Sequence, residues 1–276
     1  MDRRILSVVL IIMAVLAVAT TGCTSEAPEQ KTSEDSIKIS PDQTPAAPGE
    51  KVIYKVGVDI PYQPFSMLDD EGNPTGFDVE SIEWIAEDQG FSVEFKTIAW
   101  DGAIPALQSG SIDIIISGMT ITPERAEKIN FSTPYWTVNQ AVIAMDDSDA
   151  TVDELMAGEL TIGTHRGCTA AIWIDQNLVE TGIMPEENLK LYDNPPLAVA
   201  DLINGRVDTV MYDSTVIYDI IEGKPVKKIG LVETNEQFGI AVRKSDPELL
   251  EKINTGLENL MESPKWDEMI EKYRMK

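Results

Sequence analysis

The sequence predicts an α/β protein with two lobes. Three observations lead to this prediction: strand and helix signals alternate along residues 51–276, the pattern restarts after Met145, and the run Ile112–Ser117 is mostly apolar, as in a strand covered on both faces. Alternating strands and helices favour βαβ units and a mainly parallel sheet. Two lobes fit better than one sheet, because a single doubly wound domain would have to absorb every strand.

The first half of this region begins with a β-branched strand at Lys51–Val58. Asp78 is the expected N-cap of a helix that Gly90 ends. The apolar residues of this helix share one face: Val79, Ile82, Ile85 and Ala86. A strand at Phe91–Thr97, a helix at Gly102–Ser109 and the strand Ile112–Ser117 are expected to follow.

The second half begins with a helix whose capping box is formed by Thr151 and Glu154. The expected strands are Leu160–Thr164, Leu189–Tyr192, Thr209–Tyr212 and Phe238–Arg243. The expected helices are Thr169–Glu180, Pro196–Asn204, Ser214–Ile221, Pro247–Met261 and a short one around Trp266–Tyr273. The helix Pro247–Met261 places its apolar residues on one side: Leu249, Leu250, Ile253, Leu257 and Leu260.

The N-terminus predicts export. Residues 1–22 combine two arginines, an apolar run from Ile5 to about Ala19, and small residues before Cys23, as a signal peptide does. The run is shorter than the ~20 residues of a membrane-spanning helix, although an uncleaved anchor stays open. Cys23 after Gly22 resembles a lipobox cysteine, with Thr20 where leucine is more common, so Cys23 is the expected lipidation site. Residues 23–50 are rich in proline, serine and glutamate and predict a flexible, lipid-anchored linker.

The composition excludes some classes of partner. The formal net charge of −25 argues against binding of nucleic acid or anionic lipid headgroups, and it favours solubility outside a cell. With Cys23 lipidated, Cys168 is the one cysteine left, so no intrachain disulfide is expected.

The most informative segment runs from Trp100 to Trp136. A polar turn in it places Arg125 near Ser117 and Thr120, and a guanidinium pairs bidentately with a carboxylate. The sequence around Arg125 also allows a surface ion pair with Glu124 or Glu127. The residues alone leave open whether the carboxylate belongs to a ligand or to the protein.

Short motifs in a fixed order extend along the whole folded part. They are Asp59-x-x-Tyr62-x-Pro64-Phe65, Gly76-Phe77-Asp78-Val79, Trp100-x-Gly102-x-Ile104-Pro105-Ala106-Leu107, Ser117-Gly118-Met119-Thr120-x-Thr122-x-Glu124-Arg125, Phe131-Ser132-x-Pro134-Tyr135 and Tyr212-Asp213. In these motifs the chain resembles the polar amino-acid solute-binding proteins of ABC importers (bacterial extracellular solute-binding proteins, family 3).

The resemblance implies a two-lobed periplasmic-binding-protein fold (type II). Two crossover strands, near Tyr135–Asn139 and Thr234–Phe238, would form the hinge. Lobe one would comprise 51–135 and 238–276, with the C-terminal helices packed back on it, and lobe two 139–234. The implied function is capture of a polar L-amino acid by lobe closure and its delivery to ABC permease subunits in the membrane. The protein would be a monomer without a cofactor, held by lipid on the outer face of the cell membrane.

The same resemblance assigns roles to residues. Arg125 would bind the ligand carboxylate, helped by Ser117, Gly118, Thr120 and Thr169, and Asp213 would bind the ammonium. Tyr62 and Trp100 would sandwich the ligand side chain, with Asp59 facing them, which favours a basic or amide side chain. Each residue also has a structural interpretation: Asp213 as a helix N-cap, Tyr62 and Trp100 as core aromatics, and Asp59 as a turn residue.

The loop from Gly163 to Thr169 departs from the family pattern. Cys168 stands where relatives have a hydroxyl, and His165 and Arg166 add polar groups near the expected cleft. His165 is therefore a further candidate ligand-binding residue, and an inward-facing pair would favour an acidic side chain. Two candidate ligands, His165 and Cys168, are too few for a metal site, so none is expected.

Two other function classes remain as alternatives. An enzyme similar to the cyclohexadienyl dehydratases, which share this fold, would need a positioned acid or base in the cleft, and no surplus carboxylate or lysine stands out. The sensor module of a membrane receptor would need a transmembrane helix or signalling domain after lobe two. An amino-acid-binding protein that is not an enzyme is therefore the preferred interpretation.

Overall fold

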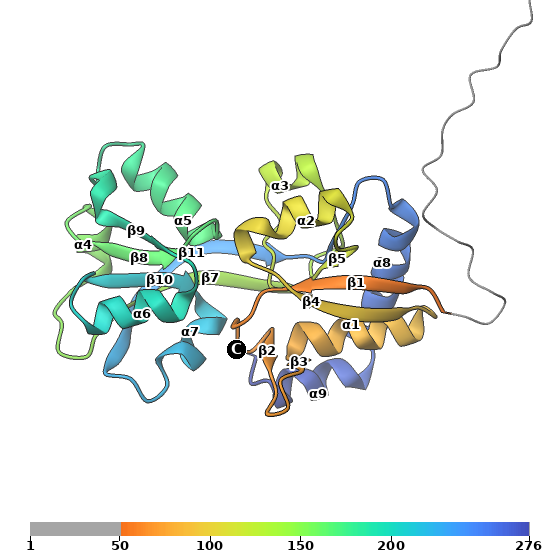
Figure 1. The fold of residues 1–276 in the computed structure, drawn as a ribbon. Helices are drawn as coiled ribbons and strands as arrows, with labels where there is room; N and C mark the ends of the chain where they lie inside the picture. Colours follow the sequence, from red (N-terminus) through yellow and green to blue (C-terminus); the bar gives the residue numbers. More distant parts are fainter. Residues whose placement is uncertain (1–50, 276) are drawn as a thin grey trace, which may run out of the picture. The chain divides into compact units, whose positions relative to one another are not determined.

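Two five-stranded sheets organise residues 51–275, the part of the chain that this computed structural model describes (Figure 1). The predicted signal peptide, the linker and Cys23 lie outside the described residues. The first sheet has the order β4-β1-β5-β12-β6, and the second has the order β11-β7-β10-β8-β9. The strands of the first are β1 (Ile53–Val58), β4 (Ser92–Thr97), β5 (Ile114–Ile115), β6 (Asn130–Phe131) and β12 (Ala241–Val242). Those of the second are β7 (Trp136–Met145), β8 (Ile162–His165), β9 (Leu189–Tyr192), β10 (Thr209–Asp213) and β11 (Val226–Phe238).

Helices cover the faces of both sheets, and each sheet with its helices is called a lobe below. Lobe one carries α1 (Phe77–Asp88), the 3-10 turn η1 (Trp100–Gly102), α2 (Ala103–Ser109), α3 (Pro123–Lys128), α8 (Pro247–Glu262), α9 (Pro264–Lys272) and the ribbon of β2 (Met67–Leu68) and β3 (Pro74–Thr75). Lobe two carries α4 (Val152–Met156), α5 (Thr169–Ile174), the π turn η2 (Asp175–Val179), the 3-10 turn η3 (Glu186–Asn188), α6 (Pro195–Ile203) and α7 (Ser214–Ile221). Helices α1 and α2 lie on opposite sides of the first sheet (Figure 1). The α/β two-lobed fold is thus confirmed.

The prediction of mainly parallel sheets holds for only part of each sheet. Strand β1 runs parallel to β4 and β5, and β8 runs parallel to β9 and β10. Strand β12, by contrast, is antiparallel to β5 and β6, and β7 is antiparallel to β10 and β11. The antiparallel strands belong to the segments that leave and re-enter lobe one, so their direction is set by the crossover and not by a βαβ unit.

Two crossover strands, β7 and β11, form the hinge. They pair antiparallel along most of their length, from Val226 opposite Met145 to Phe238 opposite Trp136, and Figure 1 shows them side by side. The crossover expected near Thr234–Phe238 is part of a longer strand, since β11 begins at Val226. In the added stretch, the apolar residues Ile229, Leu231 and Val232 do not alternate regularly with the polar ones, and pairing with β7 stabilises the stretch as a strand.

Most predicted elements match to within a few residues, and the capping box of Thr151 and Glu154 is present on α4. Four expectations were wrong. The strand expected at Phe238–Arg243 is divided, since Phe238 ends β11 and only Ala241–Val242 form β12. The run Ile112–Ser117 is regular strand only at Ile114–Ile115, and the helix expected at Thr169–Glu180 changes to a π turn after Ile174. Asp78 is not an N-cap, since α1 begins one residue earlier with Gly76 as its N-cap.

The buried Asp78 carboxylate has a different task. Its Oδ2 accepts a hydrogen bond from the Gly118 amide (2.8 Å) and another from the Tyr135 hydroxyl (2.9 Å). These bonds join α1 to the loop after β5 and to the segment that enters the hinge.

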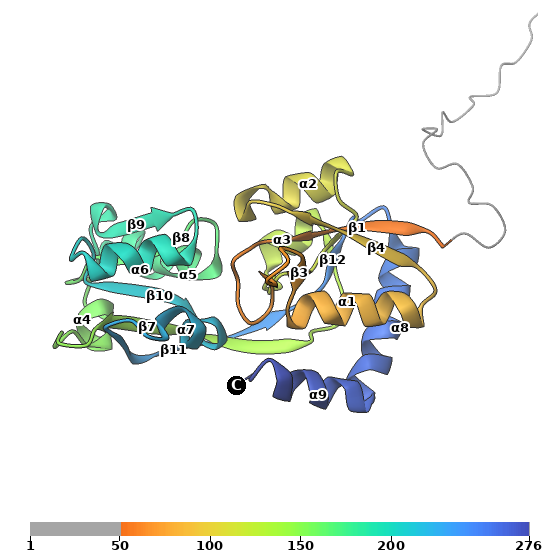
Figure 2. The same ribbon diagram turned by 60° about the horizontal axis from the view of Figure 1, so that its bottom comes forward.

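The C-terminal helices pack on lobe one, as expected. Helix α8 lies against α1, where Ile85 contacts the chain at Gly256, and its predicted apolar residues are buried or pack against the core. Glu80 of α1 forms ion pairs with Lys265 and Lys272 of α9. The view in Figure 2 shows α8 and α9 beside α1.

Candidate functional site

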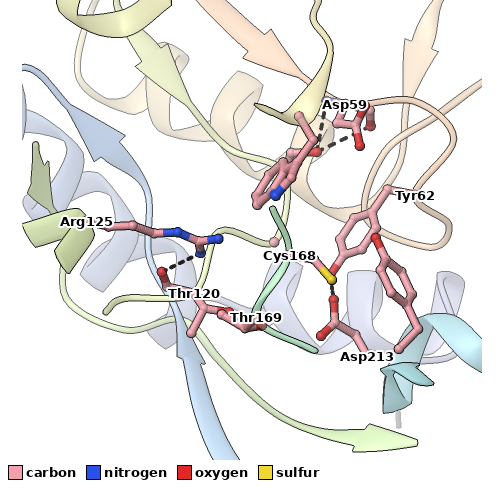
Figure 3. Close-up of a pocket in the computed structure, with 11 residues that line it drawn as sticks. Asp59, Tyr62, Thr120, Arg125, Cys168, Thr169 and Asp213 are labelled. Atoms are coloured by element: carbon pink, nitrogen blue, oxygen red, sulfur yellow. Dashed lines mark hydrogen bonds between the residues drawn. The ribbon is translucent and has the colours of Figure 1, made fainter. Parts of the chain in front are cut away.

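A small pocket lies between the two lobes, where several strands end (Figure 3). The space among its lining atoms amounts to about 270 Å³, part of it open to solvent, so the pocket is small. The lining residues are Asp59, Tyr62, Trp100, Ser117, Gly118, Thr120, Arg125, Cys168, Thr169, Tyr212 and Asp213. All sequence-predicted ligand-binding residues except His165 therefore line one pocket.

Strand topology explains the convergence. Asp59 follows β1, Ser117 follows β5, and Asp213 is the last residue of β10. Parallel strands direct their carboxyl ends to the same edge of a sheet, where open α/β sheets place ligands. The loops from the two sheets meet at this pocket.

Arg125 enters the pocket from the short helix α3. Thr122 caps this helix by accepting from the Arg125 amide at 3.2 Å, and Pro123 occupies its first turn. The side chain is only 7% exposed, and burial lowers the pKa of Arg125 below its ordinary value. Its guanidinium donates to two main-chain carbonyls, Thr120 at 2.9 Å and Gly167 at 3.2 Å.

The surface ion-pair interpretation of Arg125 is wrong. Glu124 pairs instead with Lys128 at 2.7 Å, and no carboxylate among residues 51–275 forms a salt bridge with Arg125. A guanidinium has five N–H donors, so those not used by the two carbonyls remain free for an anion in the pocket. The guanidinium also lies 5.4 Å from the centroid of the Trp100 ring.

Asp213 reaches the pocket from the other lobe, opposite Arg125 in Figure 3. Its Oδ2 accepts from the Tyr62 hydroxyl at 2.6 Å, and its Oδ1 accepts from Gln140 at 2.7 Å. Asp213 occupies the N-cap position of α7 but makes no side-chain cap bond there. Burial, followed by the charge of Glu236, raises the pKa of Asp213 to about 7.

Two residues behind Asp213 escaped sequence analysis. Gln140 on β7 is fully buried and donates to both Asp213 and Glu236. Glu236 on β11 also accepts from the Thr120 hydroxyl at 2.9 Å. The network therefore connects lining residues of both lobes through the hinge strands, and no local motif marks either residue.

Hydrogen bonds of the Asp59 main chain fix the position of this residue. Its amide donates to the Ser117 hydroxyl at 3.0 Å, and its carbonyl accepts from the fully buried Ser66 at 2.6 Å. The carboxyl group lines the pocket, and burial raises its pKa to about 7.

Gly118 cannot carry a side chain. Its φ is +58°, and a Cβ there would lie 2.4 Å from the ring of Tyr62. Only glycine adopts this conformation readily, so the aromatic wall and the polar loop pack together without a gap.

Comparison with known proteins identifies the family. Residues 54–276 match the sequence profile of the bacterial extracellular solute-binding proteins, family 3. The chain belongs to this family.

A probable histidine-binding protein of Neisseria gonorrhoeae is 34% identical over 236 residues, which cover 83% of this chain and 85% of that one. Among solved structures, an ancestral arginine-binding protein bound to arginine matches with a TM-score of 0.74 and 36% identity, covering 81% of this chain and 98% of the other. An ancestral amino acid-binding protein described as a precursor of cyclohexadienyl dehydratase matches with a TM-score of 0.69 and 35% identity, covering 80% and 95%. No helix between residues 51 and 275 is long and apolar enough to cross a membrane.

The loop that departs from the pattern of the family 3 proteins places its polar residues unequally. Cys168 and Thr169 line the pocket, and burial raises the pKa of the Cys168 thiol to about 11. Arg166 is exposed and donates to the Leu191 carbonyl, away from the pocket. His165 is buried behind the wall, where its ring lies 6.5 Å from the centroid of Trp100.

The lobes of this family 3 protein touch around the pocket. The Gly167 carbonyl of lobe two accepts from Trp100 Nε1 at 3.0 Å and from Arg125 at 3.2 Å, both from lobe one. The bond from Tyr62 to Asp213 makes a further connection. The structure therefore shows the closed arrangement, in which the two lobes contact each other around the pocket.

Proposed function

We propose that this protein captures a free polar L-amino acid between its lobes and delivers it to the permease of an ABC importer. One observation supports this above all: a buried Arg125 with unused donors and a buried Asp213 carboxylate line the same small pocket. An amino acid carries the complementary pair, a carboxylate and an ammonium on one carbon.

Arg125 binds the α-carboxylate in this proposal, together with the loop at Ser117, Gly118 and Thr120 and with Thr169. Asp213 binds the ammonium with the lone pairs that Tyr62 and Gln140 leave free. Hydrogen bonds to charged groups contribute about 1.5–3 kcal/mol each. Three or four of them supply much of the roughly −8 kcal/mol of micromolar binding.

A basic or amide side chain suits the remainder of the pocket. The side chain would lie between the aromatic faces of Tyr62 and Trp100, with the Asp59 carboxyl at hand. Two relatives have names that agree with this class: a probable histidine-binding protein and an ancestral arginine-binding protein bound to arginine. Closure of the lobes completes the set of contacts, so the ligand stabilises the closed population.

The cellular setting forms part of the proposal. Signal peptide 1–22 is removed, Cys23 is lipidated, and residues 23–50 tether the lobes to the outer face of the membrane. Residues 51–135 and 238–276 make up lobe one, and 139–234 lobe two. The protein acts as a monomer beside its permease.

Calorimetric titration of the purified protein with each of the twenty L-amino acids tests this function. One or more polar amino acids should bind with micromolar affinity or better. Arg125→Lys should weaken that binding at least tenfold, because a lysine ammonium cannot form the bidentate pair. Arg206→Lys, an exposed conservative change outside the pocket, serves as the control and should bind normally. Absence of binding by all twenty amino acids would refute the proposal.

An enzyme on the same scaffold is the second candidate, and one observation favours it. Asp59 and Asp213 both line the pocket, and each has a pKa of about 7, as a general acid or base requires. One structural relative is also described as a precursor of cyclohexadienyl dehydratase. Turnover of prephenate or arogenate would establish this candidate, whereas reversible amino-acid binding without turnover supports the binding protein.

A further inference from the structure

A single side-chain amide joins two carboxylates behind the pocket. Gln140 of β7 is fully buried, and its Nε2 donates to Asp213 Oδ1 at 2.7 Å and to Glu236 Oε1 at 2.9 Å. Asp213 lines the pocket, whereas neither Gln140 nor Glu236 is among its lining residues. Glu236 can therefore influence a ligand only from behind, through its charge and through the side chains that it contacts.

A bulge in β11 brings Glu236 to this position. In the ladder with β7, residues 233–235 lie opposite the single residue Asn139. Asn235 has a φ of +50°, which asparagine adopts more readily than most residues, and its amide donates to Asn139 Oδ1 at 2.9 Å. The extra residues set Glu236 opposite the residue two positions before Gln140 on β7, and residues two apart on a strand share a face. The bulge therefore aims Glu236 at Gln140, as bulges beside functional sites commonly do.

The two carboxylates fix the orientation of the Gln140 amide. The amide nitrogen carries two N–H donors, and the amide oxygen only accepts. With Nε2 toward Asp213 and Glu236, each carboxylate receives one N–H, and the buried Oε1 atom has no partner among residues 51–275. A reversed amide would set Oε1 against an oxygen of each carboxylate, and even a protonated Asp213 would supply a donor to only one of the two contacts. Glu236 therefore selects the orientation that offers an N–H to Asp213.

The other oxygen of Glu236 is anchored to lobe one. Its Oε2 accepts from the Thr120 hydroxyl at 2.9 Å, and Thr120 forms a β-bridge with Phe238, two residues farther along the chain than Glu236. Both carboxylate oxygens of Glu236 thus have a donor, which holds this side chain in place. A chain of hydrogen bonds therefore leads from Thr120 through Glu236 and Gln140 to the back of Asp213.

The ionisation of Asp213 responds to both neighbours. Burial is the main reason that the pKa of Asp213 is raised to about 7, and the charge of Glu236 raises this pKa as well. The N–H of Gln140 lowers it, because a hydrogen bond to the carboxylate stabilises the charged form. The donor on Oδ1 therefore affects how much of Asp213 is charged near neutral pH.

We propose that Glu236 is a positioning residue for the ligand ammonium: it orients the N–H side of Gln140 toward Asp213 and so holds the Asp213 carboxylate where the ammonium binds. The inference rests on the proposed function and deepens it. Glu236 acts through Gln140 and does not touch the ligand. Loss of one partner leaves a buried polar group unpaired, which is costly, so the effect should reach the affinity.

Calorimetric titration with L-arginine, L-histidine and L-glutamine tests the proposal at pH 8, where Asp213 is mostly charged. Glu236→Met keeps the length of the side chain but removes both acceptors, so the Gln140 amide loses its orientation and the affinity should fall about tenfold. Glu236→Gln retains a carbonyl acceptor for Gln140 and can donate to the Thr120 hydroxyl, so it should recover most of this loss. Glu233→Gln removes the same charge at an exposed position of β11 and should bind as the wild type does.

Gln140→Met should weaken binding by a similar factor. In the Gln140→Met background, Glu236→Met should add little, because both substitutions remove the same N–H from Asp213. Additive losses would overturn the proposal, since Glu236 would then act by a route that does not include Gln140. Should Glu236→Met fail to fold, as thermal unfolding would show, Gln140→Met replaces it in each comparison with Glu236→Gln.

A measurement without ligand separates two kinds of failure. In carbon-13 NMR spectra, the Asp213 carboxyl signal, assigned by its loss in Asp213→Asn, reports the titration of this group. Glu236→Met and Glu236→Gln remove the same charge, but only Glu236→Met removes the acceptor that orients Gln140. The titration midpoint of Asp213 should therefore lie at higher pH in Glu236→Met than in Glu236→Gln.

Equal midpoints in the two variants would refute the inference, because a purely structural role of Glu236 predicts no such difference. Failure of the proposed function would appear differently, as absence of binding of every amino acid by the wild-type protein. The titration of Asp213 would still decide in that case whether Glu236 orients Gln140.

Discussion

The Tyr62 hydroxyl donates to Asp213 Oδ2 over 2.6 Å, and this bond joins the loop after the first strand of lobe one to the end of β10 in lobe two. Both groups are buried, and both line the pocket. The bond therefore has two effects at once: it satisfies a carboxylate that has been removed from water, and it connects the lobes. An aromatic side chain that sequence analysis assigned to stacking also acts as an interlobe donor.

Tyr62→Phe should weaken amino-acid binding about tenfold. The substitution keeps the aromatic face but removes one donor to a buried carboxylate, and such bonds contribute about 1.5–3 kcal/mol. Calorimetry gives the affinity, and Tyr192→Phe is the matched control, since Tyr192 donates to Asp201 within lobe two, outside the pocket. Equal affinities in Tyr62→Phe and the wild type would mean that the interlobe bond does not contribute to closure.

Gly118→Ala should lower both stability and affinity. A Cβ at this position would overlap the Tyr62 ring at 2.4 Å, so the ring has to move out of the wall. Gly110→Ala separates the steric effect from backbone strain, because Gly110 has a similar φ of +77° but no atom within 4 Å of its Cβ position. Thermal unfolding and titration of both variants should show a decrease in affinity for Gly118→Ala alone. The same loss in both variants would assign the effect to backbone conformation.

A feature of this protein could be predicted from its sequence where the residues that determine it lie close together along the chain. The site could be predicted because its residues stand in short motifs at strand ends, where the order along the chain fixes the place in space. Gln140 and Glu236 could not be predicted in this way. Their hydrogen-bond partners lie 73 to 116 residues away along the chain. These residues come together only when the hinge strands pair, so no short motif marks them.

Asp78 shows the same limit on a smaller scale. Its position before an apolar helix face is typical of an N-cap, but the N-cap of α1 is Gly76, two residues earlier. The carboxylate instead accepts from Gly118 and Tyr135, which lie 40 and 57 residues away. Tertiary contacts overrode a valid local preference.

Cys168 should report lobe closure. The thiol lines the pocket, is 6% exposed, and is the one cysteine among the described residues. In a Cys23→Ser variant, in which Cys168 is the sole thiol, alkylation by N-ethylmaleimide should be slow and should become at least tenfold slower with saturating ligand. Mass spectrometry measures the rate, and unfolding in urea serves as the control for full reactivity. A rate that ligand leaves unchanged would show that binding does not shift the lobes toward the closed state.

The pH dependence should have opposite signs for stability and for binding. Burial raises the pKa of Asp213 to about 7, above its unfolded value near 3.8, so the folded state binds an extra proton between about pH 4 and 7. The contribution of this group to stability is therefore full below pH 4 and is lost as the pH rises through 7. Asp59 and Asp78 act in the same direction. Glu80 acts in the opposite direction: hydrogen bonds from Lys265 and Lys272 lower its pKa from 4.5 to about 2, so its contribution is full above about pH 4.5 and is lost as the pH falls through 2.

Asp213→Asn should therefore raise the melting temperature of the ligand-free protein at pH 8 by a few degrees, since about 1 kcal/mol corresponds to about 2–4 °C in a protein of this size. At pH 4, where Asp213 is already protonated, the variant and the wild type should melt together. Asp70→Asn makes the same change of charge at an exposed position and should shift neither value by more than about a degree. Binding should behave differently: Asp213→Asn should abolish it, because the ammonium loses its counter-charge. Wild-type affinity should weaken below pH 7, where ligand binding first has to remove the proton from Asp213. A variant that is less stable than the wild type at pH 8 would mean that the bonds from Tyr62 and Gln140 outweigh the desolvation of the carboxylate.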